Sequence, residues 1–174
     1  MRKELPFVGM ALACGLIVST LAVATRDRVV GNQRAFELRR VLSLTGDGPL
    51  AIKYSAIKER PGGYVVVHEG KTIVTISRVS TDAGYNGRIA LLVGAAAGVV
   101  TGVRVVKHAE TPGLGDAIDH GWLDVAIGKN AQSQWRVTRD GGDIDQITGA
   151  TITSSATLQA IADHLIHQAE AGNP

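Results

Sequence analysis

The sequence has few aromatic residues, a single cysteine and no block of like charge. Two Trp, three Tyr and two Phe make up 4% of the 174 residues, too few for the base-stacking surface of a protein that binds single-stranded nucleic acid. Cys14 is the only cysteine, which excludes an internal disulfide, and no Cys/His cluster has the spacing of zinc or iron–sulfur ligands. Lys and Arg number 18 against 16 Asp and Glu, so no nucleic-acid partner is expected.

Glycine, in contrast, is abundant: 21 of the 174 residues, about 12% against a usual share of about 7%. This share predicts many tight turns and close backbone approaches rather than a helical bundle. Hydrophobic residues at 45% and charged residues at 20% are typical of a globular protein and argue against a chain that is disordered throughout. The length leaves room for one modest domain and an accessory segment, which argues against a large multi-step enzyme.

An uncharged run of twenty residues lies near the start of the chain, from Leu5 to Ala24. As a helix it would be about 30 Å long, which matches the hydrocarbon thickness of a bilayer. The run therefore predicts one membrane-spanning helix, with the lipid bilayer as a partner. The arginines that follow it favour a cytoplasmic body on the positive-inside count. Long domains cross the membrane regardless of such charges, however, so the sequence leaves the side open.

Two alternatives to a retained span remain. Arg2 and Lys3 form a basic start and Ala22-Val23-Ala24 is an A-x-A site, as in a cleaved signal peptide. A lipoprotein signal with Cys14 as the acceptor is the other alternative. In that case a larger aliphatic residue would be expected at Ala11.

Short runs rich in Val, Ile and Thr follow, separated by turns that contain glycine, and these predict strands joined in hairpins. Their spacing is too tight for crossover helices, so we expect a mainly antiparallel sheet and an α+β fold with flanking helices. A short amphipathic helix from Asn32 to Leu44, ending near Gly46–Pro49, would connect it to the N-terminal helix. The predicted strands are 64–68, 72–79, 88–93 and 99–106.

The second half of the chain predicts two helices and one further strand. Residues 116–127 look helical, residues 134–139 look like a strand, and the glycine-flanked stretch 94–98 is expected to be a hairpin turn. From Ile152 onward, apolar residues recur every three or four positions, which predicts a helix of about five turns that ends at Gly172 and Pro174. We thus expect a membrane anchor over 1–28, a connector helix and linker over 29–48, and a folded domain over 49–174.

The entry to this last helix is rich in hydroxyl groups and could bind an anion. A helix N-terminus presents unpaired backbone N–H groups and the positive end of the helix dipole, which together favour a phosphate. Gly149 and Ala150 leave space for close approach, and hydroxyls add donors at Thr148, Thr151, Thr153, Ser154 and Ser155. The alternative is that one of these residues is simply the N-cap, worth about 1 kcal/mol.

Two motifs connect these residues with a known family. Asp145–Thr151 fits the D-x-x-[ST]-G-A-T flavinylation signature of FMN-binding domains, and Glu110–Gly115 fits their second motif, E-T-P-G-L-G. With its N-terminal uncharged run and its terminal helix, the chain resembles the G subunits of Rnf-type ion-translocating electron-transport complexes. It is similar also to the C subunits of sodium-pumping NADH:quinone oxidoreductases.

The resemblance implies that 49–174 is a covalent FMN-binding domain, in which a phosphoester joins the hydroxyl of Thr151 to FMN. In relatives the E-T-P-G-L-G loop borders the flavin. The residues expected to contact the flavin directly are therefore Glu110, Thr111, Leu114 and Gly115. The signature that shapes the attachment loop, and that the attaching enzyme reads, maps to Asp145, Thr148, Gly149 and Ala150, with Thr153 as a further cofactor-binding hydroxyl.

The resemblance further implies a relay subunit that passes electrons between other redox centres and has no self-contained catalytic activity. Its partners would be the other subunits of a complex coupling ferredoxin–NAD electron exchange to ion movement, and a flavin transferase using FAD and magnesium. The domain would lie on the periplasmic side of the bacterial inner membrane, anchored by a single span. Two alternatives are a flavin-free membrane-anchored scaffold or sensor, with Thr151 as a helix cap, and a free-standing flavoreductase or regulatory FMN-binding protein. No dinucleotide fingerprint is present in the sequence.

Overall fold

The computed structural model describes residues 5–44 and 57–171. In the first of these ranges it describes the side chains of residues 10–26, 29, 41, 43 and 44. The chain divides into two compact units, Met1–Arg39 and Arg40–Pro174. The predicted helix ends at Gly46–Pro49 and at Gly172 and Pro174, and the predicted domain boundary at residue 48, lie outside the described residues.

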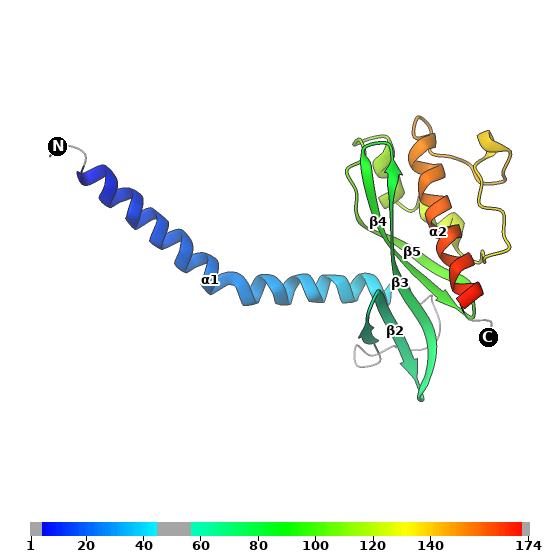
Figure 1. Ribbon diagram of the computed structural model, residues 1–174, viewed down its shortest axis with the longest axis horizontal. Coiled ribbons are helices and arrows are strands. Elements are labelled where there is room, and N and C mark those ends of the chain that lie inside the picture. The colour runs from blue at the N-terminus through cyan, green and yellow to red at the C-terminus, as the bar shows by residue number, and fades with distance from the viewer. Residues whose placement is uncertain (1–4, 45–56, 172–174) are drawn as a thin grey trace. The chain divides into compact units, whose positions relative to one another are not determined.

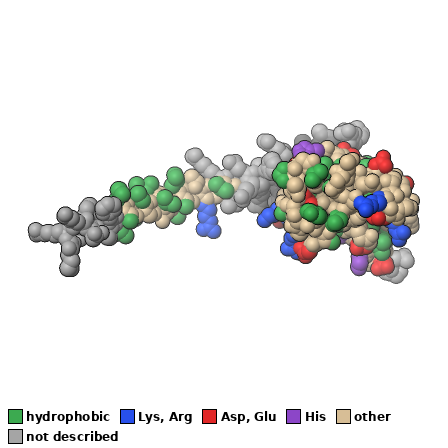
Figure 2. All heavy atoms as spheres, turned by 90° about the horizontal axis from the view of Figure 1, so that it is seen from above, with side chains coloured by type: hydrophobic (Ala, Val, Ile, Leu, Met, Phe, Trp, Pro, Cys, Tyr) green, Lys and Arg blue, Asp and Glu red, His purple; other side chains and the backbone are tan. Residues whose placement is uncertain are grey.

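The first unit is formed by most of the helix α1, Leu5–Leu42. The connector helix expected over residues 32–44 is the C-terminal part of this same helix. Large apolar side chains along α1, from Met10 to Val23, are between 62% and 75% exposed, and Figure 2 shows them gathered along this helix. Within the described part of the chain, no helix combines the length and the apolar character needed to cross a membrane, so the structure does not show the expected span.

The second unit is built on a five-stranded antiparallel sheet in which each strand pairs with the next along the chain (Figure 1). Its strands are β1 (Ile57–Arg60), β2 (Gly63–His68), β3 (Lys71–Gly84), β4 (Gly87–Ala96) and β5 (Val99–Lys107). The predicted α+β class and antiparallel sheet are thereby confirmed.

Tight turns set the register of these hairpins. Glu69 and Gly70 join β2 to β3, and Ala97 and Gly98 join β4 to β5, all four with positive φ, as a type I′ turn requires. The second turn is shorter than the stretch 94–98 expected from the sequence. Gly94 pairs with Gly102 inside the ladder, so it is a strand residue that keeps space for a neighbour.

That neighbour is Leu44, just after α1, on one face of the sheet. A Cβ added to Gly94 would lie 2.8 Å from the Leu44 carbonyl oxygen, and one added to Gly102 would lie 3.2 Å from Cδ2 of Leu44. The Thr101 hydroxyl donates a 2.6 Å hydrogen bond to the same carbonyl. Leu44 thus packs into a position that only glycine leaves open, within a small core formed by Val41, Leu44, Tyr64, Val66, Val74, Ile76 and Leu92.

The opposite face of the sheet carries the main core and the helix α2, Thr151–Ala171. The predicted C-terminal helix is confirmed, with its first residue one position earlier than expected. Leu158, Ile161 and Leu165 recur on its buried face, which gives the apolar stripe seen in the sequence. Near its end, the Gln168 amide donates a 3.1 Å hydrogen bond to the Ser77 hydroxyl on β3, so α2 is fixed to the sheet along its length (Figure 1).

Two predicted elements between β5 and α2 are wrong. The helix expected over 116–127 is instead two 3₁₀ turns, η2 (Gly115–Asp119) and η3 (Trp122–Ala126), because Gly121 between them has φ +91° and reverses the chain. The strand expected over 134–139 is a loop with one isolated bridge, Val137 to Ile144, followed by the 3₁₀ turn η4 (Thr138–Asp140). Trp135 and Val137 are buried at alternate positions. This is the burial pattern of a half-buried strand, although the segment does not form one.

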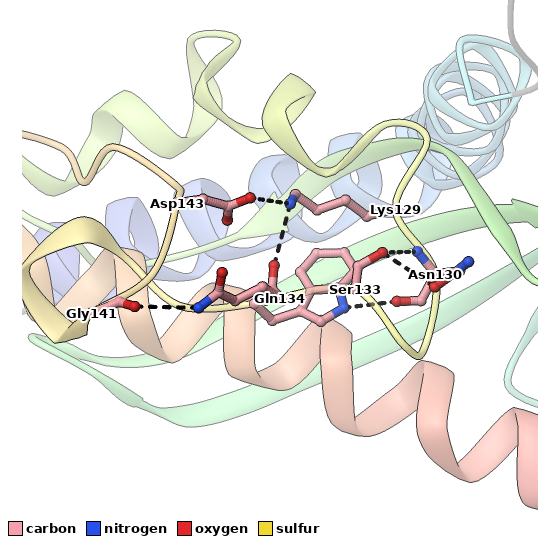
Figure 3. Close-up of polar contacts among 7 residues, drawn as sticks. Lys129, Asn130, Ser133, Gln134, Gly141 and Asp143 are labelled. Atoms are coloured by element: carbon pink, nitrogen blue, oxygen red, sulfur yellow. Dashed lines mark hydrogen bonds and ion pairs between the residues drawn. The ribbon is translucent and has the colours of Figure 1, made fainter.

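The loop after η3 is held by its own polar contacts (Figure 3). The Lys129 ammonium lies 3.5 Å from the Asp143 carboxylate and donates to the Gln134 carbonyl at 3.2 Å. The Gln134 amide donates to the Gly141 carbonyl at 3.2 Å. These contacts close the segment from 129 to 143 into a loop. The hydrogen bond from the Ser155 hydroxyl to Asp140 holds η4 beside the start of α2.

Candidate functional site

The first two turns of α2 carry five hydroxyl groups, and Thr151 differs from the others. Four of them donate hydrogen bonds: Thr153 to Glu110 (2.5 Å), Ser154 to the Ala150 carbonyl (2.9 Å), Ser155 to Asp140 (3.0 Å) and Thr157 to the Thr153 carbonyl (2.7 Å). No hydrogen bond among the described residues engages the Thr151 hydroxyl. Thr151 is half-buried and forms no capping bond, so its hydroxyl is available for another group.

Two cavities meet at Thr151. The smaller, of about 540 Å³, lies between the loop after β5, the tip of the β3–β4 hairpin and the start of α2. The larger, of about 1170 Å³, runs between β3 and α2 as far as His167. Thr151, Ile152 and Arg139 line both. A group attached to Thr151 can therefore enter either cavity without rearranging the helix.

The loop of the E-T-P-G-L-G motif is fixed from both sides through Glu110, which is only 5% exposed. One carboxylate oxygen accepts the Thr153 hydroxyl from α2, and the other accepts the backbone N–H of Asn86 at 3.2 Å. The Asn86 side chain also donates to the Thr111 hydroxyl at 3.0 Å. Glu110 thus joins three segments that are remote in the chain, and both of its carboxylate oxygens accept hydrogen bonds from within the protein.

Two glycines allow this carboxylate to fit. A Cβ on Gly115 would lie 2.8 Å from Oε2 of Glu110, and a Cβ on Gly84 would lie 2.7 Å from Oε1. Real Cβ atoms do not approach so closely, so any larger residue would displace the Glu110 side chain. The last glycine of E-T-P-G-L-G is therefore required by packing around the carboxylate.

The loop that leads into α2 is shaped by Gly149. This residue has φ +78°, and a Cβ there would lie 3.0 Å from Cδ2 of Leu114. The Ile147 N–H donates to the Ser154 hydroxyl at 3.0 Å and the Ala150 N–H to the Ile147 carbonyl at 3.0 Å. The backbone therefore turns tightly into the helix, where the first N–H groups have no partner within the helix.

The structure brings most of the predicted site residues to the smaller cavity, which is lined by Glu110, Thr111, Leu114, Gly115, Gly149, Ala150, Thr151 and Thr153. Asp145 and Thr148 do not line it. The carbonyl of Asp145 accepts the Trp122 indole N–H at 2.8 Å, and the Thr148 side chain is exposed. Both precede the helix and shape its entry.

Sequence reasoning missed three lining residues, Tyr85, Arg139 and Ile152. Tyr85 lies in the short turn between β3 and β4, outside both motifs. Arg139 was placed in a predicted strand, which concealed its position. Ile152 is 55% exposed although an apolar residue at the start of a helix is expected to be buried, and that exposure is visible only in the structure.

The far end of the larger cavity carries His164 and His167. Burial lowers the pKa of His164 below its ordinary value of 6.5, and the neighbouring charges of His167 and Arg60 lower it further. His164 is thus held in its neutral form at neutral pH.

Taken together, these features suit an organic phosphate. The first N–H groups of α2, which have no partner among the described residues, and the arginine favour its negative charge. The exposed side chains of Tyr85, Leu114 and Ile152, which are 68%, 45% and 55% exposed, offer apolar area for a planar ring. Thr151 stands between these two kinds of surface.

Comparison with known proteins agrees with this geometry. Residues 84–165 match the family model of the FMN-binding domain, a range that contains every residue lining the smaller cavity. Residues 84–165 are therefore an FMN-binding domain, and they lie within the α+β second unit.

Its relatives define the family further. The G subunit of the ion-translocating oxidoreductase complex of Shewanella amazonensis is 35% identical over 186 residues, covering 95% of this chain and 86% of the relative. The G subunit of the same complex from Pseudomonas aeruginosa is 36% identical over 182 residues, covering 92% and 85%. This chain belongs to the family of G subunits of ion-translocating oxidoreductase complexes.

Among solved structures, the chain is similar to the C subunit of the Na(+)-translocating NADH-quinone reductase from Parabacteroides distasonis. It is 23% identical, with a TM-score of 0.48, and the match covers 58% of this chain and 57% of that one.

Proposed function

We propose that this protein is a membrane-anchored flavoprotein subunit that relays electrons through one FMN, joined by a phosphoester to Thr151. The single observation that carries the proposal is the half-buried Thr151 hydroxyl, which has no hydrogen-bond partner among the described residues and lies at the meeting point of two cavities. Every other hydroxyl in the first two turns of α2 is already engaged in the fold.

Attachment requires a partner enzyme, a flavin transferase that uses FAD and magnesium. The Thr151 oxygen forms a bond to the FMN phosphorus of FAD, the pyrophosphate bond breaks, and AMP leaves. The Thr151 proton passes to the transferase or to water. The resulting phosphodiester keeps one negative charge beside the helix N–H groups, where the dipole of α2 stabilises it.

Residues of the smaller cavity would hold the flavin ring. Tyr85, Leu114 and Ile152 would contact its apolar faces, while Glu110 keeps the loop that carries Leu114 in place through Thr153. Bound FMN supplies electron transfer, and its potential is set by these surroundings because attachment through the phosphate leaves the ring unmodified. The proposed relay does not require this site to bind NADH.

The proposed location is the bacterial inner membrane, with the domain on the periplasmic side and with the other subunits of the complex as redox partners. The uncharged run from Leu5 to Ala24 supports the anchor, as do the exposed apolar side chains of α1, because a helix that exposes such side chains in water loses hydrophobic stabilisation. A covalent bond also suits a compartment in which lost FMN is not readily replaced.

The experiment is a comparison of full-length wild-type protein, Thr151→Ala and Thr151→Ser, each co-produced with the flavin transferase in a host that makes FAD. Flavin fluorescence after a denaturing gel and the intact mass both report the covalent adduct. Wild-type protein is expected to carry one FMN, Thr151→Ala none, and Thr151→Ser a measurable amount because a hydroxyl is retained.

Thr157→Val serves as the matched control, since it removes a hydroxyl further along the same helix that lies outside both motifs and lines neither cavity. It is expected to retain the adduct. Wild-type protein without flavin, or Thr151→Ala with it, would contradict the proposal and favour the flavin-free scaffold.

A further inference from the structure

The positive charge that faces the smaller cavity comes from one exposed residue, Arg139, in the 3₁₀ turn η4. Arg139 lines both cavities that meet at Thr151. Of the described residues that line the smaller cavity, it is the only basic one. Arg78 lines the larger cavity, but its guanidinium already donates to the Tyr64 hydroxyl at 2.7 Å.

The backbone around Arg139 is held firmly, while its side chain is not. The Thr138 hydroxyl and the Arg139 N–H both donate to the side-chain oxygen of Gln146, at 2.8 and 3.3 Å. Asp140 accepts the Ser155 hydroxyl from α2 at 3.0 Å. These bonds fix η4 to the loop before α2 and to the helix itself.

The Arg139 guanidinium, in contrast, takes part in no hydrogen bond or ion pair with the described residues. Its fork of N–H donors matches two oxygens of a phosphate. The neighbouring Asp140 carboxylate would repel an anion, but it lines only the larger cavity and is engaged by Ser155. The smaller cavity therefore offers an anion one unpaired cation and one helix N-terminus. Its one acidic residue, Glu110, is buried and accepts hydrogen bonds from Thr153 and Asn86.

We propose that Arg139 binds the phosphate of the group attached to Thr151, and that it helps to position that phosphate during attachment. This inference rests on the proposed function. Helix N–H groups would hold the phosphate from one side and the guanidinium from the other. Because Arg139 is exposed, the interaction is weakened by salt.

The test uses full-length wild-type protein, Arg139→Gln, Arg139→Lys and the control Arg136→Gln. Arg136 is an exposed arginine on the same segment that lines neither cavity, so its replacement removes the same charge without touching the site. Each protein is loaded with purified flavin transferase, FAD and magnesium. The rate of adduct formation is followed by intact mass, and the phosphodiester of the loaded protein by its ³¹P resonance in low and high NaCl.

Arg139→Gln is expected to shift the ³¹P resonance, to remove its response to NaCl, and to slow loading about two- to fivefold, the size of an exposed ion pair. Arg139→Lys should keep part of the shift and most of the rate, and Arg136→Gln should match wild type. Circular dichroism establishes that each variant is folded.

The two proposals fail differently. An adduct on wild type whose resonance and loading rate are unchanged in Arg139→Gln overturns the role of Arg139 and leaves the function of Thr151 standing. A wild-type protein that gains no phosphorus-containing adduct overturns both.

Discussion

The Thr153 hydroxyl donates a 2.5 Å hydrogen bond to the Glu110 carboxylate, and both side chains are buried. Glu110 belongs to the loop after β5, and Thr153 lies in the first turn of α2, two residues after the proposed attachment point. This bond therefore fixes the distance between the loop that borders the smaller cavity and the residue that would carry the flavin.

Thr153→Val is expected to destabilise the folded protein by about 1–3 kcal/mol, because it leaves a buried carboxylate oxygen without its donor. Chemical denaturation of the full chain measures the loss. Thr157→Val is the matched control: it is equally buried, but its hydroxyl donates only to the Thr153 carbonyl within the helix. A double-mutant cycle with Glu110→Gln should give a coupling of about 0.5–3 kcal/mol, and additive effects would show that the bond does not stabilise the fold.

Gly149→Ala is expected to cost about 1–2 kcal/mol of stability, since φ is +78° and an L side chain is strained there. The added methyl would also press on Leu114, so flavin loading should fall more than stability alone explains. Gly141→Ala is a useful comparison, because it has a similar φ of +79° with open space around its Cβ. Equal loading of the two variants would argue against the contact between Gly149 and Leu114.

Gly94→Ala should destabilise the second unit more than Gly102→Ala. The first Cβ would meet the Leu44 carbonyl oxygen at 2.8 Å, whereas the second would meet Cδ2 of Leu44 at 3.2 Å and its Cα at 3.3 Å, both less severe contacts. Overpacking of this kind costs about 1–3 kcal/mol. Thermal unfolding of both variants measures the order, and the reverse order would show that Leu44 is not packed against β4 as described.

Stability should fall in acid in a way that His164 partly explains. Burial, followed by the charges of His167 and Arg60, lowers the pKa of His164 in the folded state from 6.5. The unfolded chain therefore binds a proton at higher pH than the folded chain, so stability is complete above the unfolded pKa and declines as the pH drops from about 6.5 toward the folded pKa.

Denaturation of wild type and His164→Gln between about pH 8 and pH 5 tests this linkage. The difference in unfolding free energy between the two should stay constant above the unfolded pKa and change below it, in the direction that favours the variant. His120→Gln is the control. It retains His164 and should therefore keep the loss of stability in acid that His164 causes. A flat difference across the whole range would contradict the prediction.

The sheet and the last helix were predictable because their patterns are local. Alternation of Val, Ile and Thr with glycine turns defined the hairpins, and the spacing of Leu158, Ile161 and Leu165 defined α2. The segment between them was not predictable in the same way. Gly121 stops a helix that its neighbours favour, and Trp135 and Val137 alternate without a strand to pair with.

The site was predictable only through its motifs, and only in part. Glu110 and Thr111 were expected to contact a flavin. Their hydrogen bonds with Asn86 and Thr153, however, require three remote segments to come together, and no periodicity in the sequence indicates this. Arg139 gave no signal at all, because its position depends on η4 docking against α2 through Asp140 and Ser155. Side chains positioned by tertiary contacts have no signature in the sequence around them.

The surroundings of Thr151 are assembled from the tip of a hairpin, the loop after β5 and the start of α2, so they exist only once the whole domain has formed. An extended chain leaving the ribosome or the translocation channel offers the same threonine without its neighbours. If the proposed function is correct, folding of the domain precedes attachment of the flavin. A misfolded copy would stay colourless and could not enter the electron pathway.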